Sequence, residues 1–370
     1  MIAIATIVGA RPQFIKAAVV SRALREHHPE VREVLVHTGQ HYDPNMSKVF
    51  FEELDIPRPD YNLGIGGGSH GQNTGRMIEA IESVLIQVRP DWVLVYGDTD
   101  STLAGALAAV KLHFPVAHIE AGLRSFNRRM PEEINRILTD HASDLLFTPT
   151  DIATLNLATE GINGAKVKQV GDVMYDAALY YGAQAEQRSN ILNQLDLTPK
   201  AYILTTLHRA ENTDDPVRMA SILDGLAVAR QPVVWPIHPR TRKRMKEFDL
   251  TVPAVVRTID PVGHMDMVML EKHAALIVTD SGGVQKEAFF HLVPCLTLRE
   301  ETEWVETLAC GWNRLVGAAT GQLASAIQHP YVPGALPTNL YGDGSSVMQI
   351  CNALLNNKDN STFSAPAEGV

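Results

Sequence analysis

The 370-residue sequence lacks the features of a membrane protein and of a nucleic-acid-binding protein. No apolar run reaches the roughly 18 residues that a membrane-spanning helix needs, and no cluster of lysine and arginine stands out. The formal net charge of −10 argues further against a polyanionic partner. We therefore expect neither a membrane nor a nucleic acid among its partners, and any bound phosphate must be held by a few local groups.

Cysteine is also scarce. Cys295, Cys310 and Cys351 stand far apart in apolar surroundings and fit no metal-binding or redox spacing. We predict that each is a small core residue and that the protein works in a reducing cytoplasm. The apolar stretch from Met1 to Ala10 has no basic region before it, so it predicts a first strand rather than a signal peptide.

Signatures of a metal or of a redox cofactor are missing as well. His37 and His41 are four residues apart, but Gly39 lies between them and no helix is expected there. The turn after the first strand carries Arg11 where a dinucleotide-binding turn would have glycines. We expect no metal and no cofactor.

What the sequence does contain is a regular alternation of short apolar runs with helical patterns, which predicts α/β architecture with doubly wound parallel sheets. Eleven strands exceed one comfortable sheet, so we predict two Rossmann-like domains, residues 1–171 and 172–344, facing each other across a cleft. The predicted strands are Ile2–Val8, Val34–His37, Asp91–Tyr96, Val116–His118, Asp144–Phe147, Val167–Val170, Ala201–Thr206, Val233–Pro236, Val252–Val256, Ala274–Thr279 and Pro294–Leu298.

A Ser-Gly-Gly turn in the second half predicts an anion site. Ser281, Gly282 and Gly283 follow an apolar strand and open a helix, whose free N–H groups and dipole favour a diphosphate. Glu287 ends the first turn, where it is placed to accept hydrogen bonds from ribose hydroxyls. The same pattern also fits a plain turn with a capped helix.

Three carboxylates follow buried strands or open a helix in the first half. Asp98 ends one strand, Glu120 follows the next, and Glu132 comes directly after Pro131 at a helix start. Carboxylates grouped in this way raise one another's pKa, which allows acid/base chemistry near neutral pH. We interpret Glu133 as simple compensation of the helix dipole.

Cations and a histidine end other strands. Arg11 and Lys16 follow the first strand, and His208 with Arg209 follows the first strand of the second half, where they are suited to neutralise a departing phosphate. Arg299 follows the last strand, in a segment suited to close over the ligand. Alternatively, Arg11 caps its own turn and the 208–209 pair caps a helix.

Taken in order, these motifs resemble the non-hydrolysing UDP-N-acetylglucosamine 2-epimerases. The match runs from the first strand to about residue 310 and covers Gly9–Pro12 with Lys16, Gln40–His41, Gly97–Thr99, His118–Arg124, Pro131–Glu133 with Asn135 and Arg136, His208–Asn212, Asp280–Gly283 with Glu287, and Arg299–Glu303. The resemblance implies the two-domain glycosyltransferase fold (GT-B), with a C-terminal helix at 345–358 joined to the first domain. It also implies a homodimer without a cofactor.

The reaction that the resemblance implies is inversion at C2 of a UDP-2-acetamido sugar, UDP-GlcNAc to UDP-ManNAc, through a glycal and UDP that then recombine. It assigns catalytic roles to Asp98, Glu120, Glu132 and His208. It assigns contacts with the UDP-sugar substrate to Arg11, Lys16, Arg136, Arg209, Ser281, Gly282, Gly283, Glu287 and Arg299.

Two departures from the common form point to a subgroup. Gln13 and Phe14 stand where glutamate and alanine are usual, and Trp304–Glu306 replaces arginine, proline and glutamate. These variants resemble enzymes acting on UDP-2,3-diacetamido-2,3-dideoxy-glucuronic acid, used for bacterial surface polysaccharide. Arg128 and Arg129 could then pair with the sugar's C6 carboxylate. The alternatives left open are a GT-B glycosyltransferase, a hydrolysing epimerase and an inactive nucleotide-sugar sensor.

Overall fold

The computed structural model describes residues 2–40, 54–318, 321–329, 333–335, 337 and 339–356, so His41 lies outside the described residues. The chain divides into two compact units. One consists of the residues up to Ala177 together with those from Asn339 onward, and the other of Ala178–Thr338. The division falls within helix α7 (Val173–Arg188), and each unit is described by itself below.

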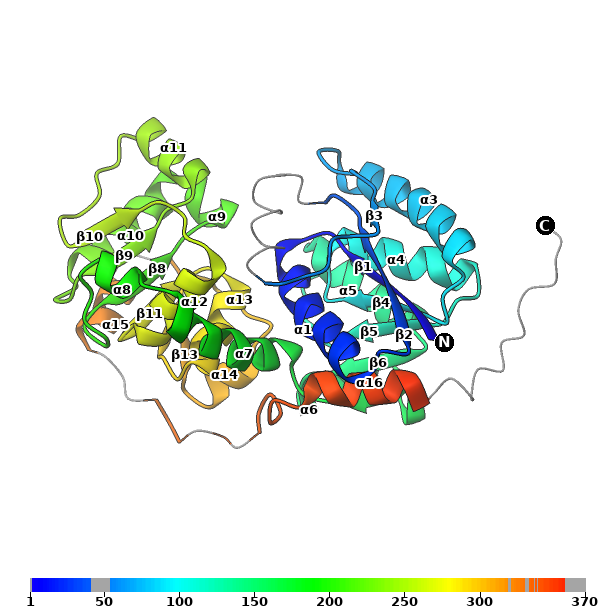
Figure 1. Cartoon of the computed structure of the whole chain (residues 1–370). Coiled ribbons are helices and arrows are strands. Elements are labelled where there is room, and N and C mark those ends of the chain that lie inside the picture. Colours follow the sequence, from blue (N-terminus) through cyan, green and yellow to red (C-terminus); the bar gives the residue numbers. More distant parts are fainter. Residues whose placement is uncertain are drawn as a thin grey trace. The chain divides into compact units, whose positions relative to one another are not determined.

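The first unit is built on a seven-stranded parallel sheet with the order β3-β2-β1-β4-β5-β6-β7, which confirms the predicted doubly wound α/β class (Figure 1). The strands are β1 (Ile2–Val8), β2 (Val31–His37), β3 (Tyr61–Asn62), β4 (Trp92–Tyr96), β5 (Val116–Ile119), β6 (Leu145–Thr148) and β7 (Val167–Gln169). The helices are α1 (Arg11–His27), α3 (His70–Val88), α4 (Asp100–Lys111), α5 (Pro131–Ala142), α6 (Asp151–Thr159), the short 3-10 turn η1 (Gly164–Lys166) and α16 (Ser346–Asn356).

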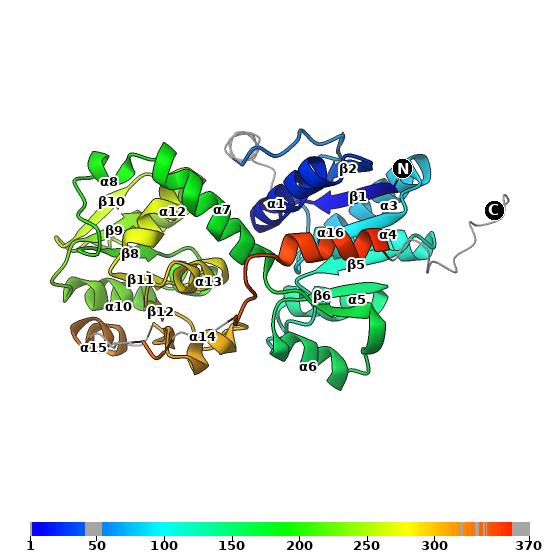
Figure 2. The same ribbon diagram turned by 60° about the horizontal axis from the view of Figure 1, so that its bottom comes forward.

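Helices cover the first sheet on both faces, which explains why its strands are apolar throughout. One face packs against α3 and α4, with Met77, Ile81 and Leu85 of α3 in the core. On the other side α16 lies next to α1, as Figures 1 and 2 both show. The C-terminal helix is therefore part of the first unit, although some 160 residues of the second unit precede it in the chain.

The second unit has a six-stranded parallel sheet with the order β10-β9-β8-β11-β12-β13. The strands are β8 (Ile203–Thr206), β9 (Val233–Pro236), β10 (Val256–Ile259), β11 (Leu276–Thr279), β12 (Cys295–Thr297) and β13 (Asn313–Leu315). The helices are α8 (Ile191–Gln194), α9 (Ala210–Thr213), α10 (Pro216–Ala227), α11 (Pro239–Glu247), α12 (His264–His273), α13 (Gly282–Phe290), α14 (Val305–Ala309) and α15 (Gln322–Gln328). Its main core joins this sheet to α10, α11 and α15.

Each sheet contains a point where the strand order reverses, between β1 and β4 in the first unit and between β8 and β11 in the second. Ligands of such sheets bind outside the carboxyl ends of the strands at this switch point. The residues that follow these four strands are therefore the first place to look for a site.

Two features predicted from composition can be compared with the structure. Cys295 and Cys351 are buried, as predicted, and burial raises the pKa of each thiol to about 12, whereas Cys310 is partly exposed. In the described parts of the chain, no helix has both the length and the apolar character needed to cross a membrane.

His291, at the C-terminal end of α13, should make the stability of the protein depend on pH. Burial of His291, with the positive charges of Lys272, Lys200 and His273 nearby, lowers its pKa to about 4 from the ordinary 6.5. Because the folded-state pKa lies below the unfolded one, His291 stays neutral on folding. Its contribution is complete above about pH 6.5 and is lost as the pH falls toward 4.

We expect His291 to account for about 2–3 kcal/mol of lost unfolding free energy between about pH 7 and pH 4. Urea unfolding across this range should show a smaller loss for His291→Gln than for the unchanged protein. An identical pH dependence in the two proteins would contradict the assignment.

Candidate functional site

The first switch point is held together by Gln13 of α1. Its Oε1 accepts hydrogen bonds from the N–H groups of Gly9 and Ala10 (2.8 and 3.0 Å), and its Nε2 donates to the Tyr96 carbonyl at the end of β4 (2.9 Å). Gln13 is buried, and its amide is fully used in joining the end of β1 to the end of β4. Gln13, one of the residues that depart from the common form of the motif, therefore has a structural role.

Asp98 lies two positions after the end of β4, and residues of helix α5 hold it in place. The Asn135 amide donates to the Asp98 carbonyl (2.9 Å), and the Arg136 guanidinium forms an ion pair with the Asp98 carboxylate (2.5 Å). The predicted cation Arg136 is thus brought together with the predicted acid/base residue. Its charge balances Asp98 directly.

Glu120 forms an ion pair with Lys16 of α1, and both side chains are nearly buried. Each of the two carboxylates that follow β4 and β5 therefore contacts a cation, and Arg136 is shared between Asp98 and Glu133. This differs from the predicted cluster, in which like charges alone raise the pKa of each carboxyl. The backbone of Glu120 has a φ of 71°, a left-handed conformation that is unfavourable for a residue with a side chain.

Gly97 leaves room for this ion pair. A Cβ atom at this position would lie 3.0 Å from Glu120 Oε2 and 3.3 Å from Lys16 Nζ, and its φ is 63°. Gly64 has a similar φ of 64° but open space around it. We expect Gly97→Ala to lower the free energy of unfolding by about 1–3 kcal/mol more than Gly64→Ala does, because only Gly97 adds a steric clash. Equal losses in chemical unfolding would contradict this reading.

The two glutamates that open α5 differ in their surroundings. Glu132 is exposed, whereas Glu133 is buried and accepts hydrogen bonds from the N–H groups of Ser125 and Phe126 (both 2.9 Å) and from Arg136 (2.9 Å). Burial alone would raise the pKa of Glu133, but these hydrogen bonds outweigh it and lower the pKa. Glu133 lies in the first turn of α5, where a negative charge compensates the helix dipole, and it also fixes the loop before α5 and contacts Arg136.

The second switch point is organised by Asp280, whose role the sequence did not reveal. This buried carboxylate follows β11 and accepts hydrogen bonds from the N–H groups of His208 and Arg209 (3.1 and 3.0 Å) and from the Asn212 amide (3.2 Å). It also lies 3.1 Å from His208 Nδ1. Burial alone would raise the pKa of Asp280, but His208, Asn212 and the Arg209 N–H lower it.

The contact with Asp280 assigns the protons of His208. Since an ionised carboxylate only accepts, Nδ1 carries a proton and Nε2 is left to exchange one with a ligand. The His208 side chain is 52% exposed, so a ligand can reach it. The arrangement resembles the general case of a histidine oriented by a buried carboxylate.

The carboxylate of Glu303 lies near the start of α13. Ser281 is the N-cap and accepts from the Val284 N–H (3.4 Å), and a Cβ atom at Gly282 would lie 2.7 Å from Glu303 Oε1. Glu303 pairs in turn with the buried Arg299 (3.1 Å). A negative group at a helix N-terminus is favourable, so Glu303 shows that this helix end accommodates an anion.

The remaining predicted residues fall as follows. Arg209 and Glu287 are partly exposed and Gly283 is exposed, while Arg299 is turned inward onto Glu303. Arg11 begins α1, but its side chain lies outside the described part of the structure. Within the described ranges, no three His, Cys, Asp or Glu side chains are grouped so that they could hold a metal ion.

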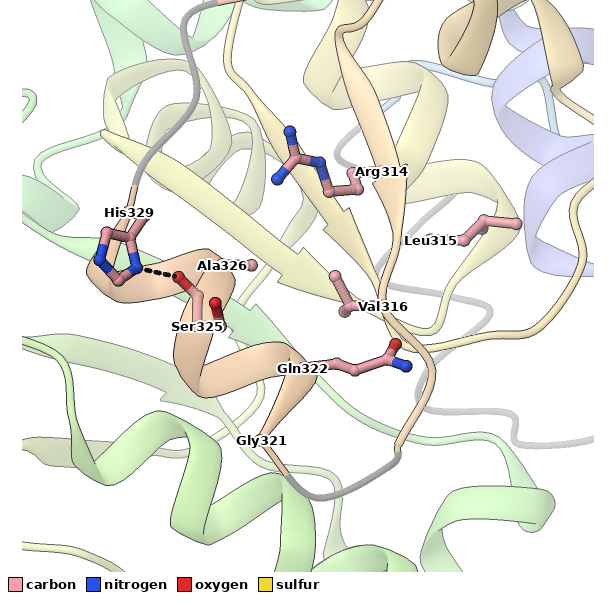
Figure 3. A pocket seen from close by; sticks show the side chains of 8 residues that line it. All are labelled: Arg314, Leu315, Val316, Gly321, Gln322, Ser325, Ala326 and His329. Carbon is pink, nitrogen blue, oxygen red and sulfur yellow. Dashed lines mark hydrogen bonds between the residues drawn. The ribbon is translucent and has the colours of Figure 1, made fainter.

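A cavity of about 400 Å³ lies elsewhere in the second unit, between β13 and α15 (Figure 3). Its walls include Arg314, Gln322 and His329, whose Nδ1 lies 3.1 Å from the Ser325 carbonyl oxygen. None of the predicted site residues lines it. This cavity is therefore separate from the residues at the switch point of the second unit.

The chain as a whole is similar to proteins of known family. Residues 22–355 match the family model described as UDP-N-acetylglucosamine 2-epimerase. The chain is 56% identical to the UDP-2,3-diacetamido-2,3-dideoxy-D-glucuronate 2-epimerase of Pseudomonas aeruginosa over 87% of this chain and 90% of that protein.

Solved structures show the same likeness. The UDP-GlcNAc 2-epimerase of Methanocaldococcus jannaschii, in complex with UDP-GlcNAc and UDP, has a TM-score of 0.87 at 45% identity, covering 96% of this chain and all of that one. The enzyme from Neisseria meningitidis bound to UDP-GlcNAc has a TM-score of 0.88 at 32% identity, with 96% and 100% coverage.

Proposed function

Since the chain belongs to the UDP-N-acetylglucosamine 2-epimerase family, we propose that it inverts C2 of a UDP-2-acetamido sugar by eliminating UDP and adding it back. The observation that carries the proposal is the pair of carboxylates Asp98 and Glu120, which follow neighbouring strands and are each balanced by a cation. Such a pair suits the removal and return of a proton.

The chemistry has two halves. In the first, the electrons of the C2–H bond form the C1=C2 double bond, the bond from C1 to the UDP oxygen breaks, and its electrons leave with UDP. In the second, a proton is added to the other face of C2 and UDP attacks C1 again. Because the C2 proton is not acidic, the departing UDP oxygen must be stabilised while its charge develops.

The second unit has the groups for that task. His208 is oriented through Nδ1 by Asp280, so its Nε2 is the proposed donor to the UDP oxygen. Arg209 and the α13 N-terminus at Ser281 add positive potential for the diphosphate. Glu287 is the proposed ribose contact, and Asp98, Glu120 and Glu132 are the proposed acid/base residues.

We propose UDP-2,3-diacetamido-2,3-dideoxy-D-glucuronate as the preferred substrate. This is the compound named for the 56% identical relative, and Arg128 and Arg129 are exposed cations in the loop before α5 that suit a C6 carboxylate. The inverted product would serve as a donor for polysaccharide assembly. UDP-GlcNAc is the alternative substrate, since relatives named for it share 46% identity.

Parallel incubation with the two nucleotide sugars, followed by proton NMR of the products, tests the proposal. We expect C2 inversion with a kcat/KM for the diacetamido uronate at least about 10-fold above that for UDP-GlcNAc, the effect of one well-placed polar contact. Stoichiometric release of free sugar would indicate a hydrolysing epimerase. No reaction with either compound would leave the protein as a nucleotide-sugar sensor and refute the proposal.

We further propose that the enzyme is a cytoplasmic homodimer. Exposed apolar side chains, Ile134 and Leu138 one turn apart on α5 and Leu155 on α6, support self-association of the first unit. Light scattering of the purified chain should give twice the mass of 40.5 kDa. A monomer at micromolar concentration would contradict this part of the proposal.

A further inference from the structure

His118 is a fully buried histidine in β5 whose two ring nitrogens both face oxygen acceptors. Nδ1 lies 2.7 Å from Asp140 Oδ1, and Nε2 lies 2.8 Å from the carbonyl oxygen of Gly97. A carbonyl oxygen can only accept a hydrogen bond, and so can an ionised carboxylate. We propose that His118 is an imidazolium, protonated on both nitrogens, and that it acts as the positioning residue for the catalytic carboxylates.

The charges around the ring place the proton on His118 rather than on Asp140. The other oxygen of Asp140 accepts from the Gly122 N–H (3.1 Å) and from the Arg124 guanidinium (2.7 Å), which both favour an ionised carboxylate. Arg124 in turn binds Glu160 through two nitrogens (2.7 and 2.8 Å). The two cations, His118 and Arg124, then balance the two anions, Asp140 and Glu160.

A neutral histidine would disturb this balance in two ways. It would leave Arg124 as the only cation shared by the carboxylates of Asp140 and Glu160, and it would point a nitrogen lone pair at an oxygen less than 3 Å away. Burial alone would raise the pKa of Asp140, but the contacts with His118 and Arg124 outweigh it and lower the pKa. These contacts favour a carboxylate at Asp140 facing an imidazolium at His118.

The ring of His118 joins the three segments that carry the proposed acid/base residues. The Gly97 carbonyl belongs to the residue before Asp98, and Glu120 lies two residues after His118 in the chain. Asp140 is on α5, the helix whose first turn contains Glu132. The paired side chains of Lys16 and Glu120 lie beside Gly97. One side chain therefore sets the spacing between β4, β5 and α5.

The protonation state is tested on the full-length protein labelled with ¹⁵N-histidine. At about pH 8 an ordinary imidazole, with a pKa of about 6.5, is neutral. The His118 resonances are those missing from the spectrum of His118→Gln. We expect both ring nitrogens of His118 to carry a proton at this pH. One protonated nitrogen and one lone-pair nitrogen would overturn the assignment.

The positioning role, which rests on the proposed epimerase function, is tested by kinetics. We expect His118→Gln to lower kcat by about 10²-fold and to change KM by less than about threefold, because the groups proposed to hold UDP belong to the second unit. An unchanged kcat, or a parallel loss of UDP affinity and thermal stability, would refute positioning.

A double variant distinguishes the positioning role of His118 from a general loss of structure. In the double variant His118→Gln/Asp140→Asn, the two amides can again donate and accept in series between Gly97 and α5, so at least about tenfold of the lost kcat should return. No recovery would show that the hydrogen bonds alone do not position the carboxylates. If the unchanged protein inverts no UDP-sugar, the proposed function is refuted. The NMR experiment tests the protonation of His118 independently of that function.

Discussion

Replacing Glu120 with glutamine is expected to lower the rate of C2 hydrogen exchange by about 10³-fold while the affinity for UDP changes less than about threefold. Glutamine keeps the size and shape of the side chain but cannot take up or return a proton. Glu120 contacts Lys16 in the first unit, whereas the groups proposed for UDP lie in the second. Exchange is measured by deuterium entering the sugar, and UDP affinity by calorimetry.

A matched substitution shows whether the loss is local. Glu79 is an exposed glutamate of α3, so Glu79→Gln makes the same chemical change on the same unit away from the site and should leave exchange within about twofold of the original rate. If Glu120→Gln retained its exchange rate, Glu120 would not be an acid/base residue. A loss of UDP affinity as large as the loss of rate would give Glu120 a structural role instead.

Removing the His208–Asp280 pair is expected to have the second-largest effect. His208→Gln should lower kcat by about 10²–10³-fold, because the departing UDP oxygen loses its proposed proton donor. Asp280→Asn should cause a similar loss. Its amide would face His208 Nδ1 and the backbone N–H groups of His208 and Arg209, which disturbs both the tautomer of His208 and the loop that carries it. Steady-state kinetics of the epimerisation measures both.

The double variant tests whether the two side chains act as one unit. We expect His208→Gln/Asp280→Asn to be no slower than the worse single variant within about threefold, because the second change removes a partner that no longer has a function. Multiplied losses would mean that Asp280 acts independently of His208. Asn212→Asp removes the hydrogen bond that the Asn212 amide donates to Asp280 and puts a second negative charge beside it, so it should raise the pKa of Asp280 and weaken the His208 interaction.

Most of the fold could be predicted because short apolar runs that alternate with helical patterns mark buried parallel strands. Ile2–Val8 and Val233–Pro236 were predicted with the bounds that the structure shows. β3 and β13 were missed because these short edge strands, Tyr-Asn and Asn-Arg-Leu, contain few apolar residues. The strand predicted at Val252–Val256 was misplaced, since β10 is an edge strand at Val256–Ile259 with polar residues and follows a proline.

The chain positions of the site residues could be predicted from the ends of strands, but their partners could not. Lys16 and Glu120 are 104 residues apart, and no local pattern indicates that they form an ion pair. Arg299 was predicted to contact substrate, yet it is buried against Glu303 only four residues on. Asp280 and His118 stood inside recognised motifs, but only the hydrogen bonds show that one orients a histidine and the other joins three segments.

The central claim is that the sugar loses its C2 proton and regains one from the other side while UDP is detached. Running the epimerisation in deuterium oxide and examining the inverted product by proton NMR and mass spectrometry tests this most directly. The account predicts one solvent deuterium at C2 of every inverted molecule. Inverted product that keeps its original C2 hydrogen would contradict it.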